Sequence, residues 1–386
     1  MNDNFTFSSV AHIVCELGAS QRVGNLLLQH FSNIRSALVV TDAGFVKTGL
    51  VDPVCASLRA AGMTVTVWSD VVADPPEAVV LQAAADARAN AIDLVIGLGG
   101  GSSMDVAKLI AVLIEGNQPL QEMYGIGNVR GPRLPLVQIP TTAGTGSEVT
   151  PISIVTTGAT TKTGVVSPRL YADLVILDAT LTVGLPPTVT AATGVDAMVH
   201  AIEAYTSRVK KNPISDMLAI QALRLLQANL VTVCTDGANL AARQSMLLGA
   251  MLAGQAFSNA PVAAVHALAY PIGGIFHVPH GMSNALVLPH VLRFNASHAE
   301  AHYAELASVL APNASGSDAA RAGAMIEAIT ALCRQVGIPT SLREFGIDET
   351  HLDRLADDAM LQTRLLGNNP RALVHADARA IYAAAL

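Results

Sequence analysis

A change in the hydrophobic pattern part-way along the chain places the strongest limit on how it can fold. Between about residues 34 and 101, the β-rich runs SALVVTD, MTVTVW and DLVIGLGGG alternate with Ala-rich helical patterns near 45–61 and 76–90. Strands and helices that alternate in this way form a parallel sheet, because each helix returns the chain to the same end of the sheet. Further strands are predicted at PLVQIP, PISIVTT, TGVVS and ADLVILD.

The β pattern stops at the turn-forming stretch GLPP, residues 184–187. Beyond it, Ala, Leu and Met recur at helical spacing and predict helices at 189–206, 214–233, 238–257, 317–336 and 373–385. We therefore expect an α/β domain with a parallel sheet over residues 1–185 and an all-helical domain over residues 186–386. No linker separates them, so we expect the two domains to share a cleft.

Composition excludes several classes of protein. Of the 386 residues 51% are hydrophobic and 14% are charged, which is enough apolar material for large cores. The mean hydropathy is +0.43, but Gly, Pro or charge interrupts each long apolar stretch, so we expect no membrane segment. A net charge of −7 with scattered Lys and Arg argues against a nucleic-acid partner.

The N-terminus and the cysteines indicate the compartment. The first twenty residues lack the basic start and the uninterrupted apolar region of a secretory signal, so a cytoplasmic location is expected. The four cysteines, Cys15, Cys55, Cys234 and Cys333, are far apart and form no CxxC pair. This spacing fits reduced thiols better than a disulfide framework or a zinc ribbon.

A glycine-rich run predicts a nucleotide site in the first domain. In DLVIGLGGGSSMDVAK, Gly99, Gly100, Gly101, Ser102 and Ser103 stand between a buried strand and a helix. Backbone amides can approach an anion closely there, and the first helical turn offers free N–H groups, so a pyrophosphate is the expected ligand. The alternative is that the glycines serve only the geometry of the turn, since the run is not the usual GxGxxG.

Two further segments belong to the same predicted site. Asp42 ends the strand SALVVTD, where its carboxylate can accept hydrogen bonds from an adenosine ribose and would repel a 2′-phosphate, which favours NAD over NADP. Alternatively, Asp42 only caps the next helix. The segment IPTTAGTGSEVT at 139–150 offers Thr141, Thr142 and Thr145 for the cofactor, although such residues are also common in ordinary turns.

Four side chains in the second domain predict a metal site. Asp196 and His200 are four residues apart in GVDAMVHAIEAY and therefore project from one face of a helix. His266 and His280 are separated by a Gly/Pro-rich stretch that can fold back toward the same point. One carboxylate and three imidazoles suit iron or zinc and do not suit calcium. A lone histidine in a helix is usually a core or surface residue, but coincidence is harder to accept for all four.

These motifs together resemble one protein family. GGGSSMDVAK, IPTTAGTGSEVT, GVDAMVHAIEAY, NPISD, the HALAYP segment and PHGMSNALVLPH are similar to the motifs of iron-containing (group III) alcohol dehydrogenases, in order and in spacing, over nearly all the chain. The resemblance implies an N-terminal dinucleotide-binding α/β domain and a helical C-terminal domain, as in the dehydroquinate synthase-like architecture. It implies metal and NAD(P) in the cleft between them, and a dimer or larger homo-oligomer.

The resemblance also implies roles for single residues. It makes Asp196, His200, His266 and His280 the metal ligands and places a cofactor-contacting set near NAD: Asp42, Gly99, Gly100, Ser102, Thr141, Thr142, Thr145 and Lys162, with Lys162 toward the nicotinamide ribose. Phe257 resembles a position beside the substrate pocket, although an aromatic residue in a helix is more often part of the core. The family name implies Fe(II), whereas Zn(II) generally binds nitrogen and oxygen ligands more tightly.

The implied reaction is hydride transfer between a nicotinamide and a small primary alcohol or diol, with a divalent ion that lowers the alcohol pKa or polarises the aldehyde. Many members of the family carry a second histidine four residues after the third ligand, where this chain has Tyr270. Because a tyrosine with a pKa near ~10 moves protons poorly at neutral pH, we hypothesise that His277 takes this role. The alternative is that His277 is a surface or outer-sphere residue.

Other functions compete with this interpretation. A maleylacetate reductase or a polyol dehydrogenase has the same scaffold, but maleylacetate is anionic and no Arg/Lys cluster adjoins the predicted ligands. A catalytically silent nucleotide-binding scaffold protein is another alternative. It would be missing a metal ligand or an intact glycine loop, and this sequence has both. The physiological substrate depends on the shape of the pocket, which one sequence does not provide.

Overall fold

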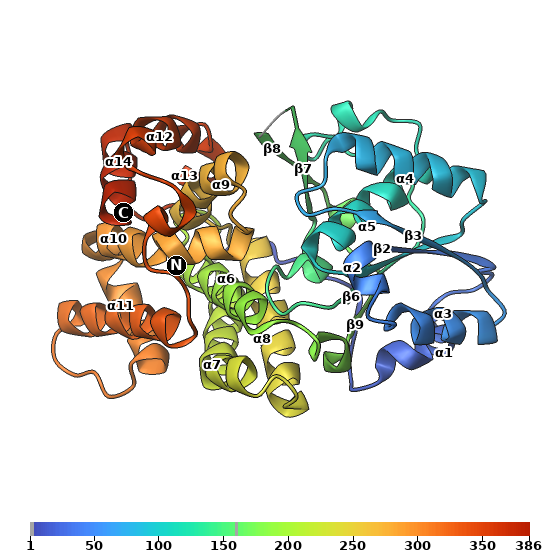
Figure 1. Cartoon of the computed structure of the whole chain (residues 1–386), viewed down its shortest axis with the longest axis horizontal. Helices are drawn as coiled ribbons and strands as arrows, with labels where there is room; N and C mark the ends of the chain where they lie inside the picture. The colour runs from blue at the N-terminus through green and yellow to red at the C-terminus, as the bar shows by residue number, and fades with distance from the viewer. Residues whose placement is uncertain (1–3, 159–160) are drawn as a thin grey trace. The chain divides into compact units, whose positions relative to one another are not determined.

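The chain forms two units, each with its own fold (Figure 1). In the computed structural model, the described residues are 4–158 and 161–386. Contacts between Cα atoms group Ser9–Gly184 into one unit, and Leu185–Leu386 with residues 4–8 into the other. The division after Gly184 lies one residue from the boundary that the sequence predicts.

Six parallel strands form the main sheet of the first unit. They are β1 (His12–Cys15), β2 (Ser36–Asp42), β3 (Thr64–Val71), β4 (Leu94–Gly99), β6 (Leu136–Pro140) and β9 (Leu174–Leu177). Their order is β1-β9-β6-β4-β2-β3, and all neighbouring pairs run parallel. The parallel sheet is thus confirmed, and β1 is the strand of this sheet that the sequence did not predict. β4 and β6 are buried throughout, as strands covered on both faces must be.

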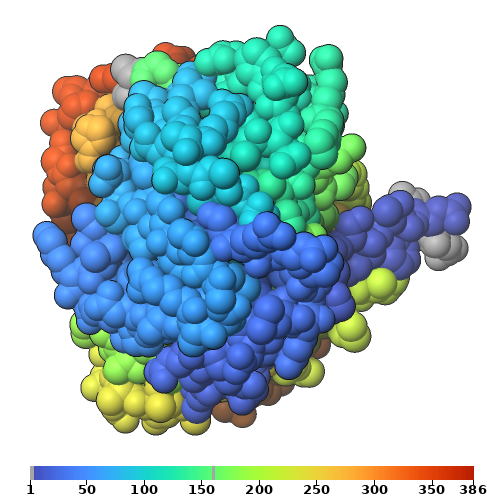
Figure 2. Space-filling model, turned by 90° about the vertical axis from the view of Figure 1, so that its right-hand side faces the viewer, coloured from blue at the N-terminus to red at the C-terminus, as the bar shows by residue number. Residues whose placement is uncertain are grey.

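Helices cover both faces of this sheet (Figure 1). On one face, α1 (Val23–His30) and α3 (Val51–Ala60) share a core with the strands, and on the other lie α4 (Glu77–Ala89) and α5 (Gly101–Glu115). Figure 2 shows the surface of this unit that α3 and α4 help to form. The helix predicted near 45–61 is two helices, α2 (Ala43–Val46) and α3, because Gly49 between them has a φ of 77°. A left-handed glycine ends a helix.

A small second sheet belongs to the same unit. It contains β5 (Gly125–Ile126), β8 (Thr161–Val166) and β7 (Ile152–Thr157), in the order β5-β8-β7. β7 and β8 are antiparallel, with Ile154 opposite Gly164. The sequence predicts both strands, but not their departure from the parallel sheet. Their connection is too short for the crossover that parallel neighbours require.

The second unit is helical, and no strand occurs among its described residues. Its helices are α6 (Pro187–Thr206), α7 (Pro213–Thr235), α8 (Leu240–Asn259), α9 (Ala264–Phe276), α10 (His280–Leu310), α11 (Asp318–Gln335), α12 (Leu352–Met360), α13 (Thr363–Leu366) and α14 (His375–Ala384). The five predicted helices are all present, with ends within two residues of the expected ones. Asn212, Asn239 and Ser317 begin three of them as capping side chains.

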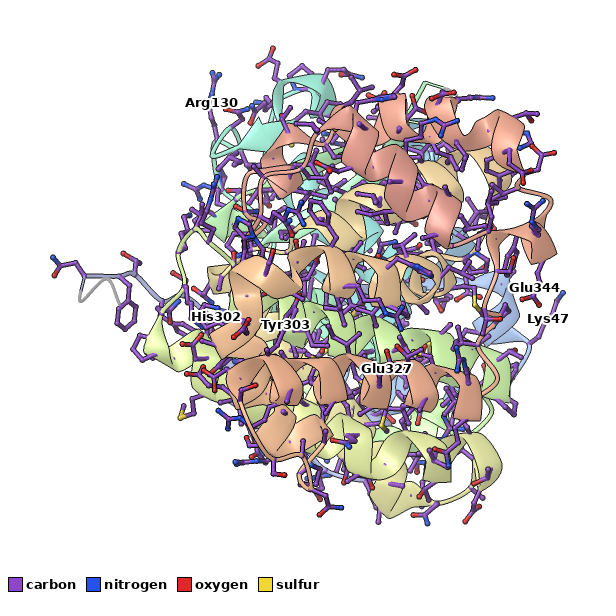
Figure 3. All side chains as sticks on the ribbon, turned by 90° about the vertical axis from the view of Figure 1, so that its left-hand side faces the viewer. Lys47, Arg130, His302, Tyr303, Glu327 and Glu344 are labelled. Carbon is purple, nitrogen blue, oxygen red and sulfur yellow. The ribbon has the colours of Figure 1, made fainter. Side chains whose placement is uncertain are left out.

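Packing among these helices places the central ones deep in the unit. α6 packs against α7, α8 and α10, so that nearly all of its side chains are buried. α11 lies along α10, where Arg293 of α10 donates to Glu327 of α11 at 2.8 Å and Tyr303 is fully buried (Figure 3). The buried polar side chains of α6 are therefore shielded from water.

The segment between His266 and His280 differs from its expected form. Instead of an irregular loop, residues up to Phe276 continue α9, with Pro271 inside the helix. The chain turns over only three residues, 277–279, and α10 begins at His280. His277 adopts a φ of 57° at the end of α9 and makes this turn possible. The two histidines thus come from two rigid helices rather than from one flexible loop.

Among the described residues, one helix is long and apolar enough to cross a membrane, namely α7. Length and composition alone are weak evidence, because core helices pass the same test. α7 packs against α6 and α8 in this structure.

Candidate functional site

One face of α6 carries three acidic or imidazole side chains at successive turns. Asp196, His200 and Glu203 are spaced i, i+4 and i+7, so they lie one above another on the helix. They are 1%, 4% and 4% exposed. Ionisable groups so deeply buried require partners, and α9 and α10 supply them.

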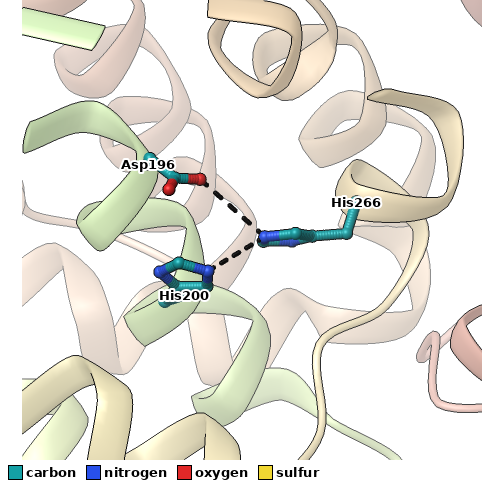
Figure 4. Close-up of side chains that lie close together, drawn as sticks. All are labelled: Asp196, His200 and His266. Atoms are coloured by element: carbon teal, nitrogen blue, oxygen red, sulfur yellow. Dashed lines mark hydrogen bonds and ion pairs between the residues drawn. The ribbon is translucent and has the colours of Figure 1, made fainter. Parts of the chain in front are cut away.

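Three of the predicted metal ligands meet at one point (Figure 4). One potential ligand atom from each of Asp196, His200 and His266 lies within 4.8 Å of the others. The Nε2 atoms of His200 and His266 are 3.0 Å apart, and His266 Nε2 is 3.8 Å from Asp196 Oδ1. His280 Nε2 is also 3.8 Å from Asp196 Oδ1. The structure therefore brings together all four residues that the sequence predicts for the metal.

The carboxylate among them is held in its charged form. Burial by itself would raise the pKa of Asp196, but the charges of His200, His280 and His266 and a hydrogen bond from Asn284 lower that pKa below its ordinary value. An ionised carboxylate is the form of this ligand that a divalent cation requires.

The donor set fits a transition metal. Oxygen from one carboxylate and nitrogen from imidazoles suit iron or zinc, and Asp196, His200 and His266 supply such atoms from buried positions. In the same place the Oδ1 atom of Asn284 is buried and accepts no hydrogen bond from any described residue. A cation bound beside the ligands would give this buried acceptor a partner.

Sequence reasoning missed Glu203, which orients His266. Glu203 Oε2 lies 2.7 Å from His266 Nδ1, and the carboxylate also accepts the backbone N–H groups of Ala263 at 3.0 Å and Val265 at 2.7 Å. With Nδ1 engaged, Nε2 of His266 faces the other ligands. A carboxylate behind a ligating histidine is a common arrangement in metal sites. The i+7 spacing from Asp196 was the available signal.

Replacing Glu203 with Gln should weaken metal binding about 10- to 100-fold, as losses of such supporting groups do. The amide carries no charge and no longer fixes the His266 tautomer, so Nε2 presents its lone pair less reliably. Competition with a chromophoric chelator for Zn(II) measures the change. Glu305→Gln is the matched control, because Glu305 lies in the same unit, is exposed, and its carboxylate accepts from Tyr205 and not from a predicted ligand. Equal affinities for the two variants would contradict the assigned role.

The structure places the other three predicted residues of this unit at different distances from the ligands. Phe257 of α8 stacks on His200, with ring centroids 4.3 Å apart and an interplanar angle of 20°. The Tyr270 ring lies 5.9 Å from the His280 ring. The side chain of His277 is exposed at the end of α9. Phe257 and Tyr270 thus border the ligands, and His277 stands at the surface.

Apart from Lys162, the predicted nucleotide residues of the first unit lie at or just after the carboxyl ends of β2, β4 and β6. β2 and β4 are neighbours although β3 lies between them in the sequence, so the sheet reverses its order there. Ligands of open α/β sheets bind at such a point. Asp42 Oδ2 lies 3.8 Å from the position of a Cβ on Gly99. Asp42 Oδ1 accepts from Phe45 N at 2.9 Å, so the carboxylate does cap α2.

The glycine loop lies against the loop that follows β6, most closely at Gly101. Thr141 N donates to Gly99 O at 3.0 Å, and a Cβ on Gly100 would lie 3.8 Å from Thr142. A Cβ on Gly101 would meet Thr145 at 2.9 Å. Gly100 begins α5 in an extended conformation without a capping side chain, and Ser102 lies in the first helical turn. The N–H groups of this turn are thus available to an anion.

Lys162 has a different partner in the structure. Its Nζ forms an ion pair with Asp74, which follows β3, and no described hydrogen bond joins it to the glycine loop. Thr156, opposite Lys162 in β7, donates its hydroxyl to Asp74 O at 2.9 Å. Lys162 is therefore part of the contact between the β7–β8 hairpin and the segment after β3.

A buried ion network behind the nucleotide loops also escaped sequence reasoning. Lys108 of α5 is fully buried and donates to Ser147 at 2.7 Å, Thr150 at 3.2 Å and Ile152 O at 2.6 Å. Burial lowers the pKa of Lys108, and the nearby Asp105 carboxylate opposes that shift. Lys108 thus ties α5 to the segment that follows the 141–146 loop. Nothing in the sequence indicates this role, because Lys108 in GGGSSMDVAK has the position of an ordinary exposed lysine.

Glu148 in this network predicts a pH effect on stability. Burial raises its pKa to about 7 against the opposing charge of Lys108, so the folded state binds a proton more tightly than the unfolded state. The unfolding free energy should therefore fall as pH rises from about 4.5 to 7, by at most about 3 kcal/mol. Glu148→Gln should flatten this slope. Urea unfolding across that pH range measures it, and an unchanged slope in the variant would contradict the assignment.

Comparisons with known proteins agree with this geometry. The model "Iron-containing alcohol dehydrogenase" matches residues 11–179, and "Fe-containing alcohol dehydrogenase family, C-terminal" matches residues 190–386. The chain is 46% identical over 352 residues to Long-chain-alcohol dehydrogenase 1 of Geobacillus thermodenitrificans, covering 90% of this chain and 89% of that protein.

Two solved structures are similar over almost their whole length. A crystal structure of 1,3-propanediol oxidoreductase has a TM-score of 0.95 and 36% identity, with 99% of this chain and all of that chain covered. Sulfoacetaldehyde reductase from Bifidobacterium kashiwanohense, in complex with NAD⁺, has a TM-score of 0.88 and 27% identity, with 98% of both chains covered. With the family models, these matches show that the chain belongs to the iron-containing alcohol dehydrogenase family.

Proposed function

We propose that this oxidoreductase uses NAD(H) to interconvert small primary alcohols or diols and their aldehydes. The observation that carries the proposal is the convergence of Asp196, His200 and His266 within 4.8 Å in a buried site. Relatives named for long-chain alcohols and for 1,3-propanediol support the substrate class. The reaction needs a nicotinamide site and an electrophilic site, and each unit supplies one of them.

The residues in and around the predicted metal site have different roles. An iron(II) or zinc(II) ion held by Asp196, His200, His266 and His280 supplies a Lewis acid for the substrate oxygen. Asp196 contributes the one negative charge among these residues, so the site keeps a net positive charge. Glu203 holds His266 in its binding tautomer. Phe257, stacked on His200, shields one side of the site from water.

The nucleotide residues favour NAD over NADP. Asp42 lies at the reversal point of the sheet, beside Gly99, where its carboxylate repels a 2′-phosphate. The relative solved with NAD⁺ supports this choice of cofactor. The first turn of α5, without a side-chain cap, offers its N–H groups to the pyrophosphate.

Replacing Asp42 with Ser should raise the ratio of kcat/KM for NADPH to that for NADH at least about tenfold, because relief of one charge repulsion is worth about 1.4 kcal/mol. Serine keeps the cap on α2, since it accepts the Phe45 N–H nearly as well as aspartate does. Steady-state kinetics with both cofactors measure the ratio. An unchanged ratio would remove Asp42 from cofactor selection.

Reconstitution tests the whole proposal. The protein is loaded with Fe(II) or Zn(II) without oxygen, and oxidation of NADH or NADPH is followed with aldehydes of increasing chain length, 3-hydroxypropanal and keto acids. We expect metal-dependent oxidation of NADH with aldehydes and little with keto acids. Silence across the panel, with metal and NADH demonstrably bound, would overturn the proposal, and turnover of keto acids alone would favour a reductase of anionic substrates.

A further inference from the structure

A fifth polar side chain reaches the point where the metal-binding residues meet. Asn284 follows His280 by one turn on α10, so both residues face α6 and α9. Its side chain is fully buried. An amide in the core is retained only where its hydrogen-bonding groups are used.

Among the described residues, the hydrogen-bonding contacts of the Asn284 side chain are with predicted metal ligands. Nδ2 donates to Asp196 Oδ1 at 2.6 Å. The same atom lies 3.3 Å from His266 Nε2 and 3.3 Å from His280 Nε2. One donor nitrogen thus lies beside three of the atoms that would bind a cation. The other amide atom, Oδ1, is buried and accepts no hydrogen bond from a described residue.

An N–H donor and a cation compete for the same acceptors. Both are positive partners of Asp196 Oδ1 and of the imidazole lone pairs, and a cation repels the positive end of an N–H dipole. A half-turn about the Cβ–Cγ bond of Asn284 exchanges Nδ2 with Oδ1, since the two atoms are nearly equal in size. That rotation gives the unsatisfied oxygen a positive partner and removes the competing donor.

We propose that Asn284 is a positioning residue of the metal centre that works in two orientations, an inference that rests on the proposed metal-dependent function. With Nδ2 inward, Asn284 holds the Asp196 carboxylate in its binding position. With Oδ1 inward, it turns an oxygen toward the bound cation. Metal affinity therefore depends on the carbonyl oxygen of Asn284 as well as on the four predicted ligands.

A purely structural role makes a different prediction. If Asn284 only holds Asp196 through its N–H group, every variant without that donor weakens the site equally. Leucine has the same branching at Cγ but neither donor nor acceptor, whereas aspartate has the oxygen atoms without the donor. Asn284→Leu and Asn284→Asp thus separate the two roles with the same side-chain branching.

The experiment measures Zn(II) affinity at one pH by competition with a chromophoric chelator. We expect Asn284→Leu to bind Zn(II) about 10- to 100-fold more weakly than the unaltered protein. Asn284→Asp should bind at least as tightly as the unaltered protein, because it supplies oxygen. The Co(II)-loaded proteins should also differ in their visible absorption bands. If the leucine variant does not fold, Asn284→Ala takes its place.

Asn295→Leu is the matched control. Asn295 is a buried amide on the same helix, about 16 Å farther along, and it pairs with Asn369 rather than with the ligands. The Asn295→Leu protein should be less stable than the unaltered protein and should bind Zn(II) with the same affinity. Equal affinity of Asn284→Leu and the unaltered protein would overturn the inference, and so would Asn284→Asp as weak as Asn284→Leu. Failure of the unaltered protein to bind Zn(II) or Fe(II) would instead overturn the proposed function.

Discussion

Asp196→Asn should lower kcat/KM for aldehyde reduction at least about a thousandfold and abolish tight metal binding. Asp196 is the carboxylate among the four predicted ligands, and the charges of the three histidines lower its pKa despite its burial. The amide removes the negative charge and can turn an N–H group toward the cation. Loss of a Lewis acid costs several kcal/mol of transition-state stabilisation, and about 4 kcal/mol corresponds to a thousandfold.

The measurement pairs steady-state kinetics with the metal content of the purified variant. Asp216→Asn is a suitable control, since Asp216 lies in the same helical unit and pairs with Lys211 at 2.6 Å, away from the ligands. It should keep its metal and most of its activity. Asp196→Asn protein that retained a full equivalent of metal and normal turnover would be incompatible with this centre.

Gly281→Ala should destabilise the helical unit and disrupt the metal centre with one added methyl group. A Cβ on Gly281 would lie 2.5 Å from Ala192 O and 3.3 Å from Asp196 Cβ. Ala192 O is a backbone atom of α6, and α6 cannot move aside without also moving Asp196 and His200. The added atom would instead push α10 from α6 and separate His280 from Asp196. We expect a loss of about 1–3 kcal/mol in stability and a fall in Zn(II) affinity.

Thermal unfolding followed by circular dichroism measures the first effect, as a fall in Tm of about 2–10 °C for a unit of this size. Gly323→Ala is the control, because Gly323 lies inside α11 with no atom within 4 Å of its added Cβ. That variant should be more stable, by about 0.5–1 kcal/mol, since alanine favours helix. A Gly281→Ala protein as stable as this control would show that α6 and α10 are not so closely packed.

Local patterns account for the parts of the fold that the sequence predicted. Helix periodicity and capping residues act within a few neighbouring residues, so α7, with Asn212 as its cap and Pro213 in its first turn, is readable without the rest of the chain. The strands of the parallel sheet are readable for the same reason. The antiparallel pairing of β7 and β8 was not predicted, because partner choice depends on connection length and on the neighbouring segment at Asp74 and Pro76.

The candidate site divides in the same way. Asp196 and His200 were predictable because four residues bring side chains onto one face of a single helix. That His266 and His280 come from two helices, with a turn of only three residues between them, was not predictable, because Pro271 and the glycines around it suggest a loop. In the structure, however, Pro271 lies inside α9 and does not end the helix.

By itself the sequence determined the two-part architecture, the glycine loop and the four candidate ligands, because these depend on residue type and on spacing within single segments. Only the tertiary structure decided which other groups join them. Glu203 meets His266 across 63 residues of sequence, and Asn284 meets Asp196 across 88. Neither residue type marks a metal site in a sequence, and only the packing of α6, α9 and α10 buries these two side chains where they form hydrogen bonds with predicted ligands.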